Sequence, residues 1–261
     1  MSEKNIKKKI QRLRKEIKYH DELYYRKNTP EIFDSDYDWL KKELIALEEQ
    51  YPHLLSSESP SQTVGDDRIQ GFETHRHLQP MLSLDNTYNK EELFEFEKHL
   101  LKTLQPQSLE YTIEPKIDGI AVSLTYKNGK FAHAVTRGNG IQGDIITHNL
   151  KTLHTLPQTL SPTQFPKIIE LRGEIYITHQ EFERINQERK QTNKPIYANP
   201  RNLAAGTVKQ IHTNADRKLE ILLHGLGHCE PEIFTRQTQF QTNLKSLNFP
   251  VIEKTWQAKS I

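Results

Sequence analysis

The amino-acid sequence predicts an α+β fold, with a helical N-terminal module followed by a domain built on a mixed antiparallel sheet. Apolar residues recur at helical spacing through roughly the first fifty positions. The stretch SSESPSQTVGDD that follows is rich in serine, proline and glycine, which indicates a linker. Beyond it, short alternating segments are interspersed with helical patterns, as in a sheet with helices around it. We expect a module at 1–55, a linker at 56–70 and the sheet domain at 71–261.

Two amphipathic helices should form the module. The apolar positions of the first share one face: Ile6, Ile10, Leu13, Ile17 and Tyr24. This helix should end near Asn28-Thr29-Pro30, because proline lacks the amide donor and clashes with the preceding turn. The second helix has one apolar face as well, formed by Tyr37, Leu40, Leu44 and Leu47. We expect Asp34 or Ser35 to cap its N-terminal amides and Pro52 to lie beyond its end.

A β-hairpin should follow residue 119. The even positions Ile120, Val122, Leu124 and Tyr126 are apolar, which is the period of a half-buried strand, and Lys116 and Asp118 fall on the same face. Asn128-Gly129 supplies the pair that a type I′ turn requires. This turn would place Tyr126 opposite Phe131, Val122 opposite Val135 and Ile120 opposite Arg137. Arg137 would then project from the face of Lys116 and Asp118.

Three helix starts and one further strand complete the domain. Asn89 with Glu92, and Thr178 with Glu181, fit capping boxes, and Asn199 precedes a proline at the first helical position. The first of these helices should span residues 89–104. The strand KIIELRGEIYIT should bury Ile169, Leu171, Ile175 and Ile177, with Arg172 and Glu174 on its other face.

Composition limits the admissible functions only loosely. The apolar fraction is 34% with a mean hydropathy of −0.77, so we expect much exposed surface, an unfilled partner face or a missing segment. A net charge of +2 neither demands nor excludes nucleic acid. Cys229 is the one cysteine, so an internal disulfide or a thiolate zinc site is excluded and a reducing cytoplasm is expected. The basic N-terminal run has no apolar core after it, and we expect neither a signal peptide nor a membrane anchor.

Lys116 in EPKIDGIAVSLTY has two interpretations. It either extends its ammonium group to solvent or pairs with Asp118, or it is a nucleophile, which requires an unprotonated amine. Suitable electrophiles would be carbonyls, giving Schiff bases, or activated phosphates, giving phosphoramidates. Because Arg137 and Arg172 are expected nearby, an anionic phosphate is favoured.

The segment Glu114-Pro115-Lys116-Ile117-Asp118-Gly119 resembles the Lys-x-Asp-Gly motif of covalent nucleotidyltransferases. Its neighbours resemble bacterial NAD-dependent DNA ligases in order and approximate spacing: HLQPMLSLDNTY, SPSQTVG, TRGNGIQGD, LRGEIYIT, YANPRNLAAGTVKQ and, in the helical module, LYYRKNTPEIFDSDYDWL. The resemblance covers nearly the whole chain. It implies an ATP-grasp-like nucleotidyltransferase domain of the ligase type, and a chain truncated at the C-terminal end of that domain.

The resemblance also implies residue roles. Lys116 would be adenylylated by NAD with release of nicotinamide mononucleotide, and AMP would then pass to the 5′-phosphate of a DNA nick, with Asp118 orienting the amine and Mg²⁺ assisting. The implied binding residues are, for adenine, Glu114 and Ser83-Leu84-Asp85; for ribose and phosphate, Arg137, Glu174 and Arg201; and for the nicotinamide half, Tyr24, Tyr25, Asp34, Tyr37 and Asp38. Tyrosine faces suit a cationic nicotinamide ring, and carboxylates accept hydrogen bonds from its amide and ribose. Packing between the two helices is an equal alternative for Tyr37. No metal-ligating residues are implied.

Several positions depart from the family pattern. Asn139 stands where an aspartate is usual, the acidic pair after it reads Gly143-Asp144-Ile145, and Lys209 replaces an arginine. The strand with a second catalytic lysine is not found, nor are the barrel, zinc and helix-hairpin-helix domains. We expect a monomer that binds NAD and does not associate with a membrane. Nicked double-stranded DNA should bind only weakly, through Arg201, Lys209 and Arg217. The alternatives are a non-catalytic homologue that binds NAD or DNA, or an ATP-dependent ligase or capping-enzyme relative.

Overall fold

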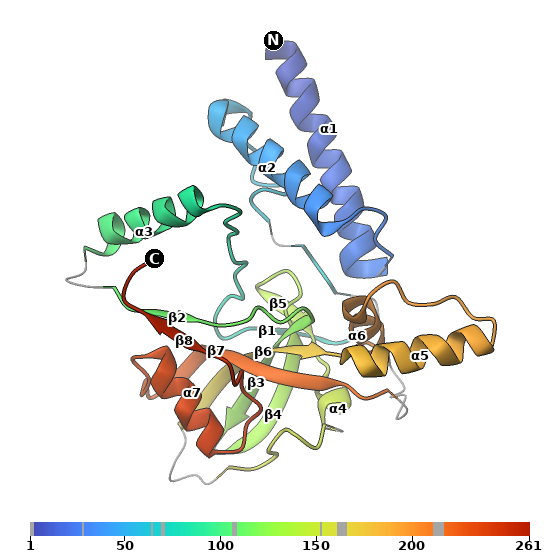
Figure 1. The fold of residues 1–261 in the computed structure, drawn as a ribbon, viewed down its shortest axis with the longest axis vertical. Helices are drawn as coiled ribbons and strands as arrows, with labels where there is room; N and C mark the ends of the chain where they lie inside the picture. Colours follow the sequence, from blue (N-terminus) through green and yellow to red (C-terminus); the bar gives the residue numbers. More distant parts are fainter. Residues whose placement is uncertain are drawn as a thin grey trace.

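The computed structural model of this chain describes residues 3–27, 29–63, 65–68, 71–105, 109–151, 153–160, 166–210 and 217–261. Figure 1 shows a helical hairpin rising from a sheet domain, and the predicted α+β class is confirmed. Asn28 and, within the expected linker, Val64, Ile69 and Gln70 lie outside the described residues.

The hairpin consists of α1 (Glu3–Asp21) and α2 (Asp34–Gln50), with a π-helical turn η1 (Glu22–Lys27) between them and a 3₁₀ turn η2 (Pro52–Leu54) after them. The two apolar faces pack on each other as predicted. Buried in this cluster are Ile6, Ile10, Leu13, Ile17 and Leu44, with Tyr37, Leu40 and Leu47 packed against it. Tyr24 does not continue the stripe. The wider π turn changes the side-chain direction, so that Leu23 is buried and Tyr24 is left half-exposed.

The predicted cap of α2 was wrong. Phe33 occupies the N-cap position, no side chain caps the helix, and Asp34 is already the first helical residue. A carboxylate in the first turn still interacts favourably with the positive end of the helix dipole. The segment after the hairpin is attached to it, since the Ser59 hydroxyl donates to Glu48 Oε1 at 2.7 Å and Arg14 pairs with the same oxygen at 2.5 Å.

The sheet domain is centred on four antiparallel strands in the order β4-β3-β6-β7. They are β3 (Ile120–Lys127), β4 (Lys130–Thr136), β6 (Ile168–Tyr176) and β7 (Glu220–Glu230). Two smaller antiparallel pairs join β1 (Thr74–Arg76) to β5 (Gln142–Asp144), and β2 (Tyr111–Ile113) to β8 (Trp256–Ala258). The helices are α3 (Lys90–Leu104), α4 (Thr147–Leu150), α5 (His179–Gln191), α6 (Pro200–Val208) and α7 (Gln237–Ser246). Of these, α4, α6 and α7 contact the four-stranded sheet.

One face of this sheet forms the core. Val122, Leu124 and Leu171 are fully buried and belong to a cluster that includes side chains of α6 and α7. As predicted for β6, its apolar positions Ile169, Leu171 and Ile175, with Ile177 beyond the strand, are buried. Arg172 and Glu174 lie on the opposite face of the sheet, which does not form part of this apolar core.

The helix starts follow the local sequence. Asn89, Thr178 and Asn199 each accept a hydrogen bond from the backbone N–H three residues on, as predicted. The reciprocal half of the first capping box differs, because the Glu92 carboxylate accepts from the Tyr88 N–H instead of the Asn89 N–H.

The hairpin turn is confirmed, but its register was only partly right. Asn128 and Gly129 both have positive φ, at 50° and 73°, and Tyr126 pairs with Phe131. A bulge then shifts the register, so that Val122 lies opposite Thr136, and the Arg137 N–H donates to Ala121 O at 3.0 Å. Because a one-residue slip exchanges the two faces of a strand, Arg137 shares the face of Ala121 and not that of Ile120.

Candidate functional site

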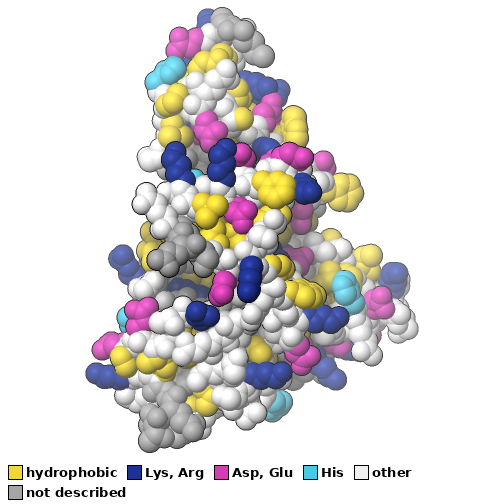
Figure 2. All heavy atoms as spheres, turned by 60° about the vertical axis from the view of Figure 1, so that its left-hand side comes forward, with side chains coloured by type: hydrophobic (Ala, Val, Ile, Leu, Met, Phe, Trp, Pro, Cys, Tyr) yellow, Lys and Arg dark blue, Asp and Glu magenta, His cyan; other side chains and the backbone are white. Residues whose placement is uncertain are grey.

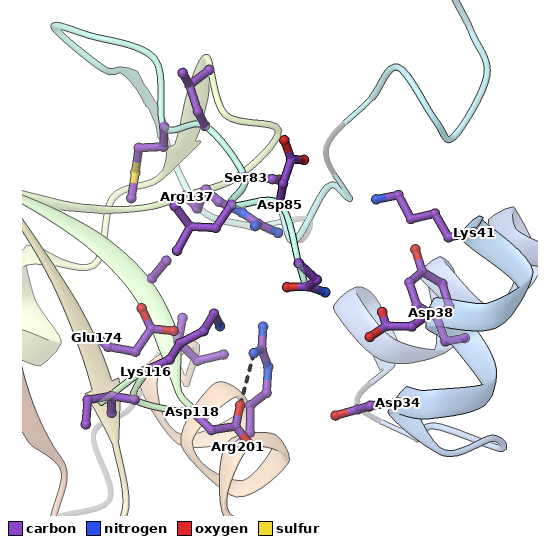
Figure 3. Close-up of a pocket in the computed structure, with 18 of the residues that line it drawn as sticks. Asp34, Asp38, Lys41, Ser83, Asp85, Lys116, Asp118, Arg137, Glu174 and Arg201 are labelled. Atoms are coloured by element: carbon purple, nitrogen blue, oxygen red, sulfur yellow. Dashed lines mark hydrogen bonds and ion pairs between the residues drawn. The ribbon is translucent and has the colours of Figure 1, made fainter. Parts of the chain in front are cut away.

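A cleft of about 1340 Å³ lies between the helical hairpin and the sheet face that the core leaves free. Its walls come from α2, residues 79–88, residues 114–121, β6, α6 and β7. All thirteen residues expected in the site line it: Tyr24, Tyr25, Asp34, Tyr37, Asp38, Ser83, Leu84, Glu114, Lys116, Asp118, Arg137, Glu174 and Arg201. In Figure 3, Asp34 and Asp38 lie on the helical side, across from Lys116, Asp118, Glu174 and Arg201.

Lys116 reaches this cleft by a route that differs from the prediction. Strand β3 begins at Ile120, so the alternation does not extend back to Lys116 and Asp118, which are exposed in the irregular segment before it. Gly119 brings that segment against β6, since an added Cβ would lie 2.2 Å from Ile175 O. The expected inward position on the apolar face was therefore wrong, and the lysine instead lies at the open side of the sheet.

The free sheet face carries the charged groups around Lys116. Ala121 pairs with Glu174 across β3 and β6, and the bulge brings Arg137 to the same face. Burial raises the pKa of the Glu174 carboxyl to about 7, against the opposing effect of Arg201, Lys116 and Arg137. This carboxyl therefore changes charge near neutral pH.

Arg201 enters the cleft from the first turn of α6, where Asn199 and Pro200 fix the start of the helix. Its Nη1 donates to Asp118 Oδ1 at 3.2 Å, the contact drawn in Figure 3. This ion pair holds the carboxylate two residues from Lys116.

Two tyrosines of η1 face arginines of the sheet domain. The Arg201 guanidinium lies 4.9 Å from the Tyr24 ring centre, and that of Arg137 lies 5.4 Å from the Tyr25 ring centre. Tyr37 lines the cleft and also packs on the hairpin core, and its hydroxyl donates to Asp21 Oδ1 at 2.6 Å. The tyrosine faces are thus suited to cations, as expected, and in this structure the cations are guanidinium groups.

The hairpin and the α3 region meet at the other end of the cleft. The Tyr88 hydroxyl donates to Asp38 Oδ2 at 2.9 Å. Lys42 Nζ lies 2.7 Å from Glu92 Oε1 and 4.9 Å from the Tyr88 ring centre. No local pattern in the sequence predicts these contacts, because the two hydrogen bonds join residues fifty positions apart.

Other cleft residues were also missed or only partly anticipated. His224 lines the cleft from β7, and its Nε2 lies 3.9 Å from Glu174 Oε2. Arg172, expected near the lysine, lines the cleft as well, with its Nη2 2.5 Å from Glu170 Oε1 and 2.6 Å from Gln79 O. The alternating polar positions of β6 signalled Arg172, whereas nothing in the sequence around His224 marked it as part of a site.

The departures from the family pattern have local explanations. Asn139 Oδ1 accepts from the N–H groups of Ile141 and Gln142, both at 3.1 Å, and so stabilises its own turn. Lys209 is buried between two carboxylates, at 3.2 Å from Asp67 Oδ1 and 3.5 Å from Asp144 Oδ2.

Arg201, Lys209 and Arg217, which we expected to contact DNA, do not form an exposed basic face. Arg201 points into the cleft and the side chain of Lys209 is only 6% exposed. Arg217 donates to Thr207 Oγ1 and to the Tyr197 hydroxyl. On the face drawn in Figure 2, basic and acidic side chains are interspersed.

Among the residues that the structure describes, no group of three or more histidine, cysteine, aspartate or glutamate side chains is arranged to hold a metal ion. No helix in the described part of the chain has the length and apolar character needed to cross a bilayer.

Comparisons with known proteins agree with the geometry. Residues 69–261 match the family of NAD-dependent DNA ligase adenylation domains, and residues 3–65 match the DNA ligase-like N-terminal NAD⁺-binding domain. The chain is 48% identical over 257 residues to DNA ligase 1 of Opitutus terrae, and 44% identical over 252 residues to the DNA ligase of Thermotoga neapolitana. These alignments cover 96% and 95% of this chain but only 38% and 36% of the two relatives.

Proposed function

This chain belongs to the NAD-dependent DNA ligase family, and on that premise we propose that it carries out the adenylation step, with Lys116 as the nucleophile. The observation that carries the proposal is the single cleft that joins Lys116, the arginines and the tyrosine and carboxylate side chains of the hairpin. NAD has a phosphate-linked adenosine half and a nicotinamide half, and this cleft offers a distinct wall to each. Residues 1–55 would hold the nicotinamide half, residues 56–70 would be the linker, and residues 71–261 would be the adenylation domain.

The reaction would be a transfer of the adenylyl group. The lone pair of Lys116 Nζ attacks the adenylyl phosphorus, a nitrogen–phosphorus bond forms, and the bond from that phosphorus to the bridging oxygen breaks. Nicotinamide mononucleotide leaves with the bridging oxygen, and the lysine loses a proton. Glu174 faces the same cleft and is partly ionised near neutral pH, so its carboxylate would accept that proton.

The other side chains would mainly position the substrate and neutralise charge. Arg137 and Arg201 would face the pyrophosphate, where guanidinium groups stabilise phosphate oxygens. Mg²⁺ commonly binds through substrate phosphates and one or two carboxylates, and the exposed carboxylate of Asp118 beside Lys116 fits that role. When bound, the ion would reduce the electrostatic repulsion between the Asp118 carboxylate and the negatively charged pyrophosphate.

We also propose that the chain binds a nicked DNA duplex weakly. The 5′-phosphate at the nick would accept AMP. Because Arg201, Lys209 and Arg217 are engaged within the protein, we propose few phosphate contacts. We further propose a monomer in the cytoplasm, consistent with the single cysteine in the sequence.

Intact mass spectrometry after incubation with NAD and Mg²⁺ tests the proposal. We expect one adenylyl group on the protein, lost in Lys116→Ala and kept in Lys127→Ala, which removes an exposed lysine of β3. An adduct formed with ATP but not NAD would indicate the ATP-dependent alternative. NAD binding without an adduct would indicate the non-catalytic alternative, and an adduct that persists in Lys116→Ala would refute the assigned nucleophile.

A further inference from the structure

Two glutamines of α7 contact the cleft residue Glu114 from behind. Gln237 Nε2 donates to Glu114 Oε1 at 3.2 Å, and Gln241 Nε2 donates to the same oxygen. Gln237 Nε2 also donates to His224 O at 2.7 Å, which connects the carboxylate to β7. Glu114 is thus held by side chains more than a hundred residues away along the chain.

These contacts leave Glu114 with one oxygen for a ligand. Gln241 is only 8% exposed, so its carboxamide is costly to leave without a partner and favours a fixed geometry. Both glutamine donors are on Oε1, and among the described residues no hydrogen bond to Oε2 is formed. Since Glu114 lines the cleft two residues before Lys116, Oε2 is a hydrogen-bond acceptor available beside the proposed nucleophile.

A fixed acceptor of this kind distinguishes purine bases. Adenine presents an exocyclic amino group, which donates to a carboxylate, whereas hypoxanthine presents a carbonyl at the same position. A carbonyl facing a carboxylate leaves two acceptors opposed and the site unsatisfied, and such mismatches are strongly discriminated.

We propose that Gln241 and Gln237 are positioning residues that hold Glu114 so that the cleft selects adenine over hypoxanthine. This inference rests on the proposed function, in which the cleft binds the AMP half of NAD. The two glutamines do not touch the base, and they act by restricting the direction of the Glu114 carboxylate.

The test is calorimetric binding of AMP and of inosine monophosphate to the full chain. The wild-type chain should prefer AMP, and Gln241→Leu should reduce the ratio of the two affinities by about tenfold, the effect typical of losing one hydrogen bond to a charged group. Gln237→Leu should act in the same direction and changes a residue that is only partly buried, so it remains informative if Gln241→Leu does not fold. Gln239→Leu is the matched control, because Gln239 is exposed on the same helix and outside the cleft.

The possible results distinguish a failure of the positioning role from a failure of the proposed adenylation function. A ratio unchanged in both glutamine variants but lowered in Glu114→Gln would overturn the positioning role and leave the proposed function standing. Equal loss of AMP and inosine monophosphate affinity in both variants would also overturn it, because a purely structural defect does not discriminate between bases. If the wild-type chain binds neither AMP nor NAD, the proposed function fails together with the inference.

Discussion

Replacing Glu174 by glutamine should stabilise the protein at alkaline pH and leave its stability at low pH nearly unchanged. The carboxyl lies on the cleft face of β6, and burial raises its pKa from the ordinary 4.5 to about 7. Between these two values the folded state holds a proton that the unfolded state has released. Stability therefore falls as pH rises through this interval and stays low above about 7.

The size of the effect follows from the two pKa values. The difference between 7 and 4.5, at about 1.4 kcal/mol per unit, gives about 3 kcal/mol of stability lost across the interval. A neutral glutamine of nearly the same shape does not ionise and avoids this loss. The difference in free energy of unfolding between Glu174→Gln and wild type should thus be about 3 kcal/mol more favourable to the variant at pH 8 than at pH 4.5.

Urea denaturation of both proteins from pH 4.5 to pH 8.5 measures this difference directly. Ionisable groups distant from Glu174 titrate in the same way in both proteins, so their contributions cancel when one curve is subtracted from the other. Glu183→Gln, which removes an exposed carboxyl of α5, is the control and should show a difference that varies little with pH. A wild-type and Glu174→Gln pair with parallel stability curves would refute the assignment of a buried, raised-pKa carboxyl to this position.

Two further predictions concern the ligands. In calorimetry, Asp38→Asn should weaken binding of nicotinamide mononucleotide about tenfold and leave AMP binding unchanged. Asp36→Asn changes a residue of the same helix outside the cleft and should change neither affinity. If Asp38→Asn weakened AMP binding as much as nicotinamide mononucleotide binding, the assignment of α2 to the nicotinamide half would be contradicted. Nicked duplex should bind in the range of roughly 10⁻⁴ to 10⁻⁶ M and weaken steeply with salt in mobility-shift assays, and nanomolar, salt-resistant binding would show that our estimate of few phosphate contacts is wrong.

The sequence predicted those features that local interactions decide. Asn89, Thr178 and Asn199 cap helices because each cap involves a backbone amide only three residues away. The Asn128-Gly129 turn was predictable for the same reason, since positive φ at two adjacent positions limits the residue choice.

Features that depend on distant contacts were not predictable. The bulge in the β3–β4 hairpin has no marker in the sequence, and it reversed the expected face of Arg137. The cleft position of Lys116 depends on where β3 begins. The alternation of apolar residues around it suggested a longer strand. The contact of Gln241 with Glu114 joins residues 127 positions apart, and no local pattern reports such a pairing.

The residues predicted for the site line one cleft, even where the strand register used in the prediction was wrong. Arg137 was expected beside Lys116 through a register that the structure does not have, yet both side chains line the cleft. The motif resemblance, which does not depend on strand register, carried that expectation.

The π-helical turn at the end of α1 has a consequence for how the hairpin is oriented. Neighbouring residues of a helical turn point in different directions around its axis, and Tyr24 and Tyr25 are neighbours in η1. Here one ring meets Arg201 of α6 and the other meets Arg137 beyond β4. Rotation of α1 about its own axis would separate both rings from their guanidinium groups at once. The two contacts together therefore define a single angular setting of the hairpin, which neither contact could define by itself.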